Sequence, residues 1–473
     1  METKSDRHHV PPADIRQSFS SAMSAMYSKE VPLYGELLDL VGHSNRVILS
    51  RDTDLREKLD ATDNLDRIHI ERHGAIRVGL PEELAQVAQV LKVMDMIPTG
   101  YYDLASANIP VHATCFRPHK SSELTKNPFR LFVSLLRPEL ISSESLRGKA
   151  LDILSRRQIF SKRMFELLGV FAANQGLIES EAREFVSEAT KSFQWHTSAA
   201  VTQDVYQELA SDSAILADIV AFRSPHINHL TPRALDIDAV QVLMNEWNIP
   251  AKDCIEGPPK RNCPILLRQT SFKAIEEPID FLAGVSGSTP ASTGYVPGHH
   301  KARFGEIEQR GAALTVAGRS LYDSLLGSAR AKGINATNGK AFADHFASFP
   351  DSWEEMREQG LAWFWYYISP SKRALAPPSV AAFDLESLIE EDWIRYEPIV
   401  YEDFLPISAA GIFQSNLSKD GDKAESVSLQ PATEASKLLF EKALGIKVKD
   451  EMVLYHQLQD ESIEQCRKWI ERK

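Results

Sequence analysis

Cysteine is scarce in this chain: 473 residues include only Cys115, Cys254, Cys263 and Cys466, and no two of them form a C-x-x-C pair. Such scattered cysteines exclude a disulfide framework and a structural zinc site built on C-x-x-C pairs, and they predict a reducing compartment. The sequence also lacks a run of 18 apolar residues, so we expect no membrane-spanning helix. The first dozen residues are polar and carry charges of both signs, unlike a signal or transit peptide. We therefore expect a soluble, cytoplasmic protein with no membrane partner.

Positively charged residues are also fewer than negatively charged ones. Lys and Arg total 53 against 65 Asp and Glu, which gives a formal net charge of −12. A nucleic-acid-binding protein would present a basic face, so we expect no nucleic-acid partner, although a local basic pocket for a small anion remains compatible with this balance. No P-loop, G-x-G-x-x-G, G-x-S-x-G or H-E-x-x-H motif is present, so the common nucleotide, esterase and zinc-protease sites are excluded.

Two stretches of the chain predict the same order of elements. Each begins with a strand that carries a histidine and continues with a helix. The first strand is predicted over 68–78 and carries His73; the second carries His229. We expect the first helix to start at Pro81 and end at Ile97–Pro98, and the second to start near Asp236 and end at Ile249–Pro250. Further strands are predicted in the first stretch at 110–116 and 129–136, and in the second at 264–270 and 303–314. Two βαβββ units of this kind can pack side by side and enclose a pocket that one unit cannot close.

These patterns predict an α+β fold that forms one catalytic unit over residues 14–473. The first βαβββ-like module covers 62–138, a helical insertion covers 139–218, and the second module covers 219–316. A mainly helical region follows at 317–473, and an extended apolar segment returns near 400–413. The Gly-, Ser-, Thr- and Pro-rich stretch 284–302 is either a lid or a simple insertion.

His73 and Arg77 point to a candidate site. On a strand they share one face and lie roughly 13 Å apart along the chain, at about 3.3 Å per residue. A histidine and an arginine so placed can bracket a short diacid. The plainer interpretation is a core histidine and a surface arginine that pairs with Glu71.

His229 holds the position in the second module that His73 holds in the first, and Glu306 and Glu308 share a face of a later predicted strand. His73, His229 and Glu306 would supply two imidazoles and one carboxylate, the facial triad that binds Fe(II) and leaves three positions open. We expect His226 to be a structural hydrogen-bonding residue. His299 and His300 are alternative candidate ligands. We discount them because adjacent residues in a Gly/Pro-rich loop are poorly placed to keep the defined geometry that a metal site needs.

Several longer segments carry a resemblance to a known family: ERHGAIRV (71–78), TGYYDL (99–104), PHINHLTPR (225–233), RFGEIEQRG (303–311) and LPISAAGIF (405–413). They resemble the 2-oxoadipate dioxygenase/decarboxylase family, also called hydroxyglutarate synthase, over nearly the whole chain. This family is similar to the vicinal oxygen chelate superfamily, which is built from paired βαβββ modules. The resemblance therefore implies a metal pocket between two such modules, with large helical insertions.

The resemblance also implies the roles of individual residues. His73 and His229 correspond to the family's metal histidines, and Arg77 to its essential arginine. FGEIEQR is similar to FLEIIQR of 4-hydroxyphenylpyruvate dioxygenase, whose first glutamate binds the metal, so Glu306 is preferred as the third ligand and Glu308 is second. The family's substrate contacts map to Ile407 and Ser408, and the isoleucine replaces the family's valine.

The activity implied is an Fe(II)-dependent conversion of 2-oxoadipate and O₂ to 2-hydroxyglutarate and CO₂ in lysine breakdown. Arg77 would bind the far carboxylate with two parallel hydrogen bonds, and the sequence shows no other obvious cation beside the triad. Two alternatives stay open: another metal in the same triad could catalyse a glyoxalase-like isomerisation, or the enzyme could act on another 2-oxo acid. A non-enzymatic scaffold is disfavoured because all the implied ligands are intact. The sequence does not define the oligomeric state.

Overall fold

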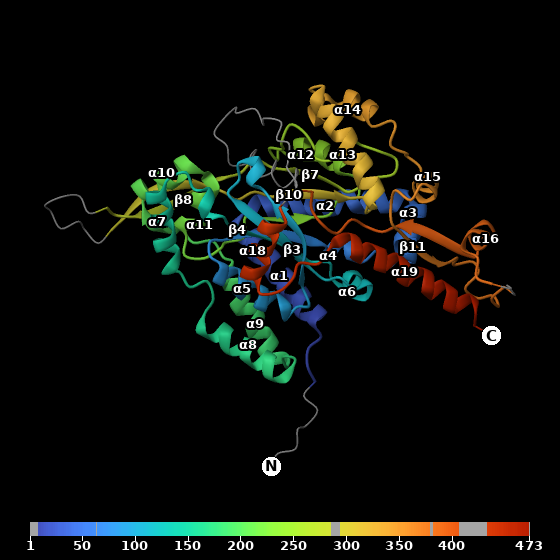
Figure 1. Cartoon of the computed structure of the whole chain (residues 1–473), viewed down its shortest axis with the longest axis horizontal. Coiled ribbons are helices and arrows are strands. Elements are labelled where there is room, and N and C mark those ends of the chain that lie inside the picture. The colour runs from blue at the N-terminus through green and yellow to red at the C-terminus, as the bar shows by residue number, and fades with distance from the viewer. Residues whose placement is uncertain (1–7, 63, 285–293, 379–381, 406–432, 473) are drawn as a thin grey trace, which may run out of the picture.

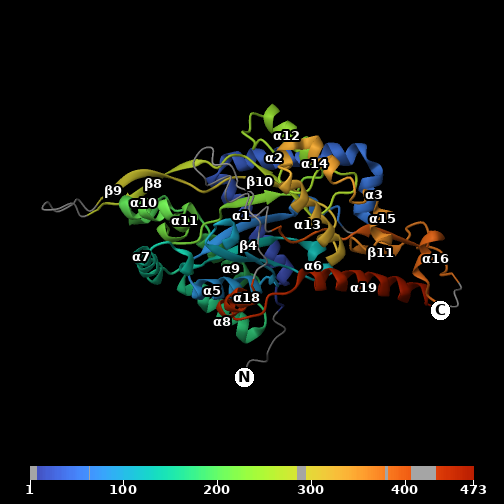
Figure 2. The same cartoon turned by 45° about the horizontal axis from the view of Figure 1, so that its top comes forward.

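The structure, a computed structural model, describes residues 8–62, 64–284, 294–378, 382–405 and 433–472. Figures 1 and 2 show helices and short sheets that surround a central group of strands, with one long hairpin that extends away from the body. Within the described ranges, no helix combines the length and the apolar character needed to cross a bilayer.

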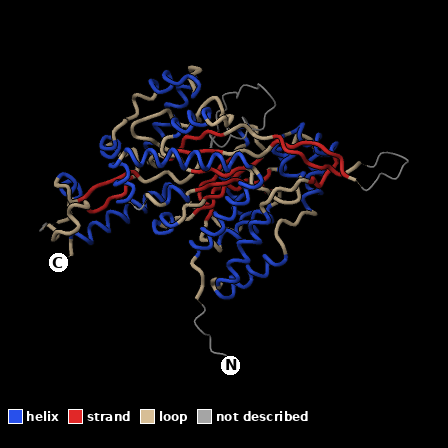
Figure 3. Tube along the Cα trace, turned by 180° about the vertical axis from the view of Figure 1, so that it is seen from behind, coloured by secondary structure: helices blue, strands red, loops and turns tan. Residues whose placement is uncertain are grey.

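The central sheet has the strand order β2-β3-β4-β1-β6. Its strands are β1 (Arg72–Val78), β2 (Ile97–Asp103), β3 (Val111–Arg117), β4 (Arg130–Leu136) and β6 (His229–Pro232). Strand β1 runs parallel to β4 and antiparallel to β6. Next to β6 lies the antiparallel pair of β10 (Glu306–Arg310) and β7 (Leu267–Ser271), joined to it by a bridge between Arg233 and Glu308. In Figure 3 these strands form the red group at the centre of the molecule, and the red strands to either side belong to other sheets.

The first predicted module is present in its predicted order. Strand β1, helix α5 (Pro81–Lys92), β2, β3 and β4 form a βαβββ unit, with the short helix α6 (Ser121–Lys126) between the last two strands. Two predicted boundaries are wrong. Residues 67–70 form helix α4 (Arg67–Ile70), stabilised by the ion pair between Arg67 and Glu71 at 3.1 Å. Ile97 and Pro98 begin β2 instead of ending a helix, which is possible because β2 is the edge strand of its sheet.

The elements predicted for the second module are present: strand β6, helix α12 (Ile237–Glu246), strand β7 and, within the predicted 303–314 stretch, β10. Two further strands that were not predicted, β8 (Glu276–Leu282) and β9 (Tyr295–Lys301), leave the central group. They form a hairpin that pairs with β5 (Ser198–Thr202) of the helical insertion. This is the long hairpin of Figures 1 and 2, and β9 lies inside the stretch 284–302 that the sequence suggested as a loop.

Helices cover the sheet and extend the molecule at both ends. The N-terminal helices are α1 (Pro12–Glu30), α2 (Pro32–Arg51) and α3 (Thr53–Ala61). The insertion contains α7 (Glu144–Ser155), α8 (Lys162–Asn174), α9 (Glu179–Ser192), α10 (Gln203–Asp212) and α11 (Ala214–Ala221), which agrees with the predicted helical stretch. The last region contains α13 (Val316–Ala331), α14 (Gly339–His345), α15 (Trp353–Glu358), β11 (Phe364–Ile368), α16 (Leu385–Glu390), β12 (Ile394–Pro398), α18 (Glu434–Leu444) and α19 (Glu451–Ile470). The hairpin of β11 and β12 was not predicted.

The alternation of side chains gives β1 two different faces. Ile76 and Val78 point into one apolar core, with side chains from α1, α2 and α5. His73 and Arg77 point to the other side, and cross-strand pairing places His229 and Thr231 of β6 there too. We call this side the polar face; its buried side chains are His73, Arg77, Arg130, Ser134, His229, Thr231, Arg233, Gln269, Ser271, Glu306, Glu308 and Arg310. Gly74 lets β6 approach closely, since a Cβ atom there would lie 3.1 Å from the backbone oxygen of His229.

Candidate metal centre

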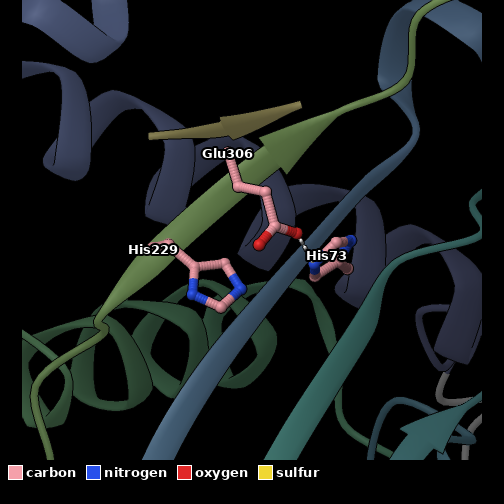
Figure 4. A group of neighbouring side chains, drawn as sticks. All are labelled: His73, His229 and Glu306. Carbon is pink, nitrogen blue, oxygen red and sulfur yellow. Dashed lines mark ion pairs between the residues drawn. The ribbon is translucent and has the colours of Figure 1, made fainter. Parts of the chain in front are cut away.

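The structure brings His73, His229 and Glu306 together on the polar face. They come from β1, β6 and β10, and one possible ligand atom from each lies within 4.8 Å of the others. All three residues are buried. Figure 4 shows the carboxylate of Glu306 between the two imidazoles, with one oxygen facing His73 and the other turned toward the side of His229.

The position of Glu306 suits a metal ligand. Its Oε1 lies 3.0 Å from His73 Nε2 and accepts hydrogen bonds from Gln269 Nε2 at 2.6 Å and Thr231 Oγ1 at 3.2 Å. Its Oε2 is buried and has no hydrogen-bond partner among the described residues. Two ligand atoms that bind one metal at about 2.1 Å and at a right angle lie about 3 Å apart, close to the His73–Glu306 separation. The donor set and the unpartnered oxygen therefore fit a divalent cation.

Glu308 occupies a different place from Glu306. Its Oε2 lies 2.9 Å from Nδ1 of His73, the ring nitrogen that faces away from Glu306. Arg310 holds the same carboxylate with two hydrogen bonds of 2.8 Å. A carboxylate on the second nitrogen of a metal-binding histidine fixes the tautomer and the ring orientation. The geometry thus favours Glu306 as ligand and Glu308 as the residue that orients His73.

The charges of the cluster also suit a cation. Burial lowers the pKa of His229 to about 4, so this ring is neutral near pH 7 and keeps a lone pair. Burial would also lower the pKa of His73, but the carboxylates of Glu308 and Glu306 outweigh it and raise the pKa. Burial alone would raise the pKa of Glu306, yet His229 and His73 lower it. Glu306 is therefore an anionic donor at neutral pH.

Arg77 lies on the polar face, as predicted, but it pairs with a protein carboxylate that the sequence analysis missed. Its Nη1 contacts Oδ2 of Asp218, and both residues are buried. The sequence also suggested that no other cation accompanies the triad, and this is wrong. Arg130, Arg233 and Arg310 lie on the same face, where they form ion pairs with Glu71, Glu402 and Glu308.

Ile407 and Ser408 lie outside the described residues. The segment that leads to them is firmly held: Glu402 pairs with Arg67 at 2.9 Å, and Asp403 pairs with Arg117 at 2.7 Å. The ring of Phe404 meets the ring of His73 edge-on, with 4.8 Å between centroids. The described end of the return segment therefore touches the candidate metal centre.

His226 and His300 belong to a second buried cluster, with Asp218. Their Nε2 atoms lie 3.1 and 2.9 Å from Asp218 Oδ1. The structural role expected for His226 agrees with this contact. His300 is not in a loop, as expected from the sequence, but in β9, and it joins Asp218 rather than the triad. A sequence signal for Asp218 did exist, because it is the only charged residue in the otherwise apolar helix AILADIVA.

Comparison with known proteins defines the class. Residues 19–416 match the family model described as 2-oxoadipate dioxygenase/decarboxylase. The chain therefore belongs to this family, which places it among the oxidoreductases.

Individual relatives are similar over nearly their full length. The 2-oxoadipate dioxygenase/decarboxylase of Escherichia coli (strain K12) is 49% identical over 453 residues, which cover 96% of this chain and 98% of that protein. The protein of the same name from Pseudomonas putida is 47% identical over 467 residues, 97% of each chain. The crystal structure of the hydroxyglutarate synthase in complex with 2-oxoadipate from Pseudomonas putida matches with a TM-score of 0.88 and 45% identity, and the match covers 98% of this chain and 99% of that one.

Proposed function

We propose that this protein is an Fe(II)-dependent dioxygenase/decarboxylase that converts 2-oxoadipate and O₂ to 2-hydroxyglutarate and CO₂. The proposal includes a role in lysine breakdown and a cytoplasmic location. Family membership and the relative crystallised with 2-oxoadipate support it. The observation that carries it is the convergence of His73, His229 and Glu306 within 4.8 Å on the polar face.

The proposed reaction needs no second organic substrate. The carbon–carbon bond between C1 and C2 of 2-oxoadipate breaks, and C1 leaves as CO₂. One atom of O₂ enters the new carboxylate at C2, and the other becomes the hydroxyl group on the neighbouring carbon. The substrate supplies all the electrons, so no separate 2-oxo acid is consumed.

His73, His229 and Glu306 would hold the iron, which supplies redox chemistry with O₂ and a template for the 2-oxo acid group. The protein's own contribution is to position the side chains that would bind the metal. Gln269 and Thr231 fix the carboxylate of Glu306, and Glu308 fixes the ring of His73. Phe404 and Phe132 form an apolar wall beside His73 that keeps water from this side of the centre.

Arg77 would bind the far carboxylate of the substrate. Its backbone lies on the same strand face as His73, roughly 13 Å away along β1. Its long side chain can bring the guanidinium group closer to the metal centre than this backbone distance. A guanidinium group matches a carboxylate with two parallel hydrogen bonds. We propose that Ser408 and the backbone at Ile407 provide further substrate contacts.

The test is anaerobic loading of the purified protein with Fe(II), followed by O₂ uptake with a panel of 2-oxo acids. We expect uptake and CO₂ release in a 1:1 ratio with 2-oxoadipate, and 2-hydroxyglutarate as product. Loading with zinc or nickel is the control and should give no uptake. An isomerised product formed with zinc or nickel, without O₂ consumption, would instead favour glyoxalase-like chemistry.

A further inference from the structure

Asp218 lies at the centre of a buried group of hydrogen-bond donors. Its Oδ1 lies 3.1 Å from His226 Nε2 and 2.9 Å from His300 Nε2, and each ring can donate a hydrogen bond to it in the tautomer protonated at Nε2. Its Oδ2 accepts from Asn228 Nδ2 at 3.3 Å and pairs with Arg77 Nη1. A carboxylate has about four acceptor positions, so these donors saturate Asp218 and fix it in place.

The donors are fixed in turn by more distant elements. His300 Nδ1 lies 2.7 Å from the hydroxyl of Tyr206, which can donate to it while Nε2–H of the same ring donates to Asp218. Trp195 covers the group: its ring stacks on His300 and meets His226 edge-on. Arg77 on β1 is therefore held by Asp218 of α11, which is in turn held by Asn228 just before β6 and by His300 of β9. Tyr206 of α10 contacts His300 and completes the group.

Asp218, His226 and His300 could also form a metal site by residue type alone. The guanidinium of Arg77 argues against it. A divalent cation at Asp218 would face a positive charge already paired with the same buried carboxylate, and like charges repel strongly away from water. The atoms of the three residues that face one another, Asp218 Oδ1 and the two Nε2 atoms, contact one another directly without a metal.

We propose that Asp218, supported by His226, His300 and Tyr206, is a positioning residue that aims Arg77 at the distal carboxylate of the substrate and so sets the preference for dicarboxylates. This inference rests on the proposed function, because it needs Arg77 to contact the substrate. A fixed guanidinium loses little conformational freedom when a carboxylate arrives. A 2-oxo acid without a second carboxylate gains nothing from this arrangement.

The experiment compares two ligands that differ only at the far end, 2-oxoadipate and 2-oxohexanoate. Dissociation constants are measured by calorimetry on the Fe(II)-loaded full chain under anaerobic conditions, where no turnover occurs. In Asp218→Asn we expect the constant for 2-oxoadipate to rise about 10- to 100-fold, the usual effect of losing a residue that orients a functional group. The constant for 2-oxohexanoate should stay at the parent's value, so the ratio between the two ligands collapses.

Glu83→Gln is the matched control. Glu83 pairs with Arg157 at 2.6 Å, both side chains are buried, and Arg157 also donates to the backbone of Ile219 next to Asp218. This variant removes a comparable buried charge from the same neighbourhood and should leave the ratio of the two dissociation constants unchanged.

Tyr206→Phe removes only one hydroxyl at the partly exposed end of the group, so it tests the proposal even if Asp218→Asn does not fold. It should weaken 2-oxoadipate binding about two- to tenfold.

Three results would overturn the inference: an unchanged ratio in Asp218→Asn and Tyr206→Phe, equal weakening of both ligands, or a second bound metal per chain that disappears in Asp218→Asn. Failure of the proposed function is a separate outcome. In that case the parent protein itself neither binds 2-oxoadipate nor consumes O₂ with it.

Discussion

Glu306 and Glu308 stand on the same face of β10 and both contact His73, but they contact different nitrogens of its ring. From the sequence, Glu306 was preferred as the metal ligand because of the resemblance to a known motif. The strand pattern alone could not distinguish it from Glu308, because residues two apart on a strand point to the same face. The difference arises from Arg310, which neutralises Glu308 and leaves Glu306 as the carboxylate with an unpartnered oxygen.

These positions predict different effects of two similar substitutions. Glu306→Gln should abolish Fe(II) binding, because an amide is a neutral and weaker ligand. Glu308→Gln should keep one iron per chain but weaken its affinity about 10- to 100-fold, since only the orientation of His73 is lost. Metal analysis and an anaerobic Fe(II) titration measure both quantities. Retention of tight iron binding by Glu306→Gln would identify a different ligand set.

Arg77 should control activity on dicarboxylates and not metal binding. Arg77→Ala should still bind iron. Its kcat/KM for 2-oxoadipate should fall by a factor that corresponds to about 2–5 kcal/mol of lost transition-state stabilisation, the range for truncating one partner of a buried charge pair. Arg77→Lys should recover little of this loss, because an ammonium group cannot make the planar two-point contact. Steady-state O₂ uptake with matched iron content decides the question, and equal activity of parent and Arg77→Ala would exclude the role.

At the scale of elements, the first module could be predicted because its strands follow one another along the chain, and local periodicity defines each of them. In the second module β6, α12, β7 and β10 were predicted in the same way, whereas β8 and β9 were not, because they pair with β5 and periodicity does not show pairing between strands far apart in the sequence. His73 and His229 were found because their strands carry recognisable motifs. Asp218 was missed although it is the one charged residue of its helix, because a single carboxylate in a helix does not show which distant residues will contact it.

The return segment includes Ile407 and Ser408, the proposed substrate contacts, which lie beyond the described residues. Ser408→Ala should raise KM for 2-oxoadipate, because a hydrogen bond to a charged group contributes about 1.5–3 kcal/mol. Ser408→Leu should abolish turnover by steric exclusion and leave iron content and thermal stability unchanged. A leucine variant with normal steady-state kinetics would restrict the segment to a structural role.

Helix α19 carries a pH-sensitive residue at its first position. Burial raises the pKa of Glu451 to about 7, with help from Asp403 and Asp450 and against the effect of Arg117. The folded state therefore holds this proton more tightly than the unfolded chain. Its contribution to stability is complete below the ordinary pKa, falls as pH rises, and is lost above about 7. Glu451→Gln should thus be about 2–3 kcal/mol more stable than the parent at pH 8 and similar to it at pH 4.5, as measured by urea unfolding.

At the scale of the whole molecule, the two main cores join distant parts of the chain. One contains residues from Ala75 to Ile470, and the other contains residues from Ile15 to Val448. The backbone near Lys449 also bonds to β2, through Lys449 N–H to Pro98 O and Gly100 N–H to Lys449 O, each at 2.9 Å. The modules expected from the sequence therefore share their cores with the regions that flank them.

This sharing predicts one unfolding transition. Calorimetry on the metal-free chain should give a single peak, because no module keeps its core when another unfolds. A chain truncated after residue 444 should be much less stable, since it loses Tyr455 and the partner of the β2 edge. Two resolved peaks, or a truncated chain with the parent's transition temperature, would mean that the C-terminal region is an independent unit.

The pairing of Arg77 with Asp218 bears on any attempt to redesign the enzyme. The arginine belongs to the module that holds the candidate metal ligand His73, whereas the residues that we propose orient it belong to α10, α11, β9 and the segment just before β6. A protein engineer who wants a variant for a longer or an uncharged 2-oxo acid can therefore keep β1 intact and vary only these peripheral elements. Conversely, a shortened chain without α10 and α11 would retain the residues His73, His229 and Glu306 and lose Tyr206 and Asp218, two of the residues that we propose orient Arg77.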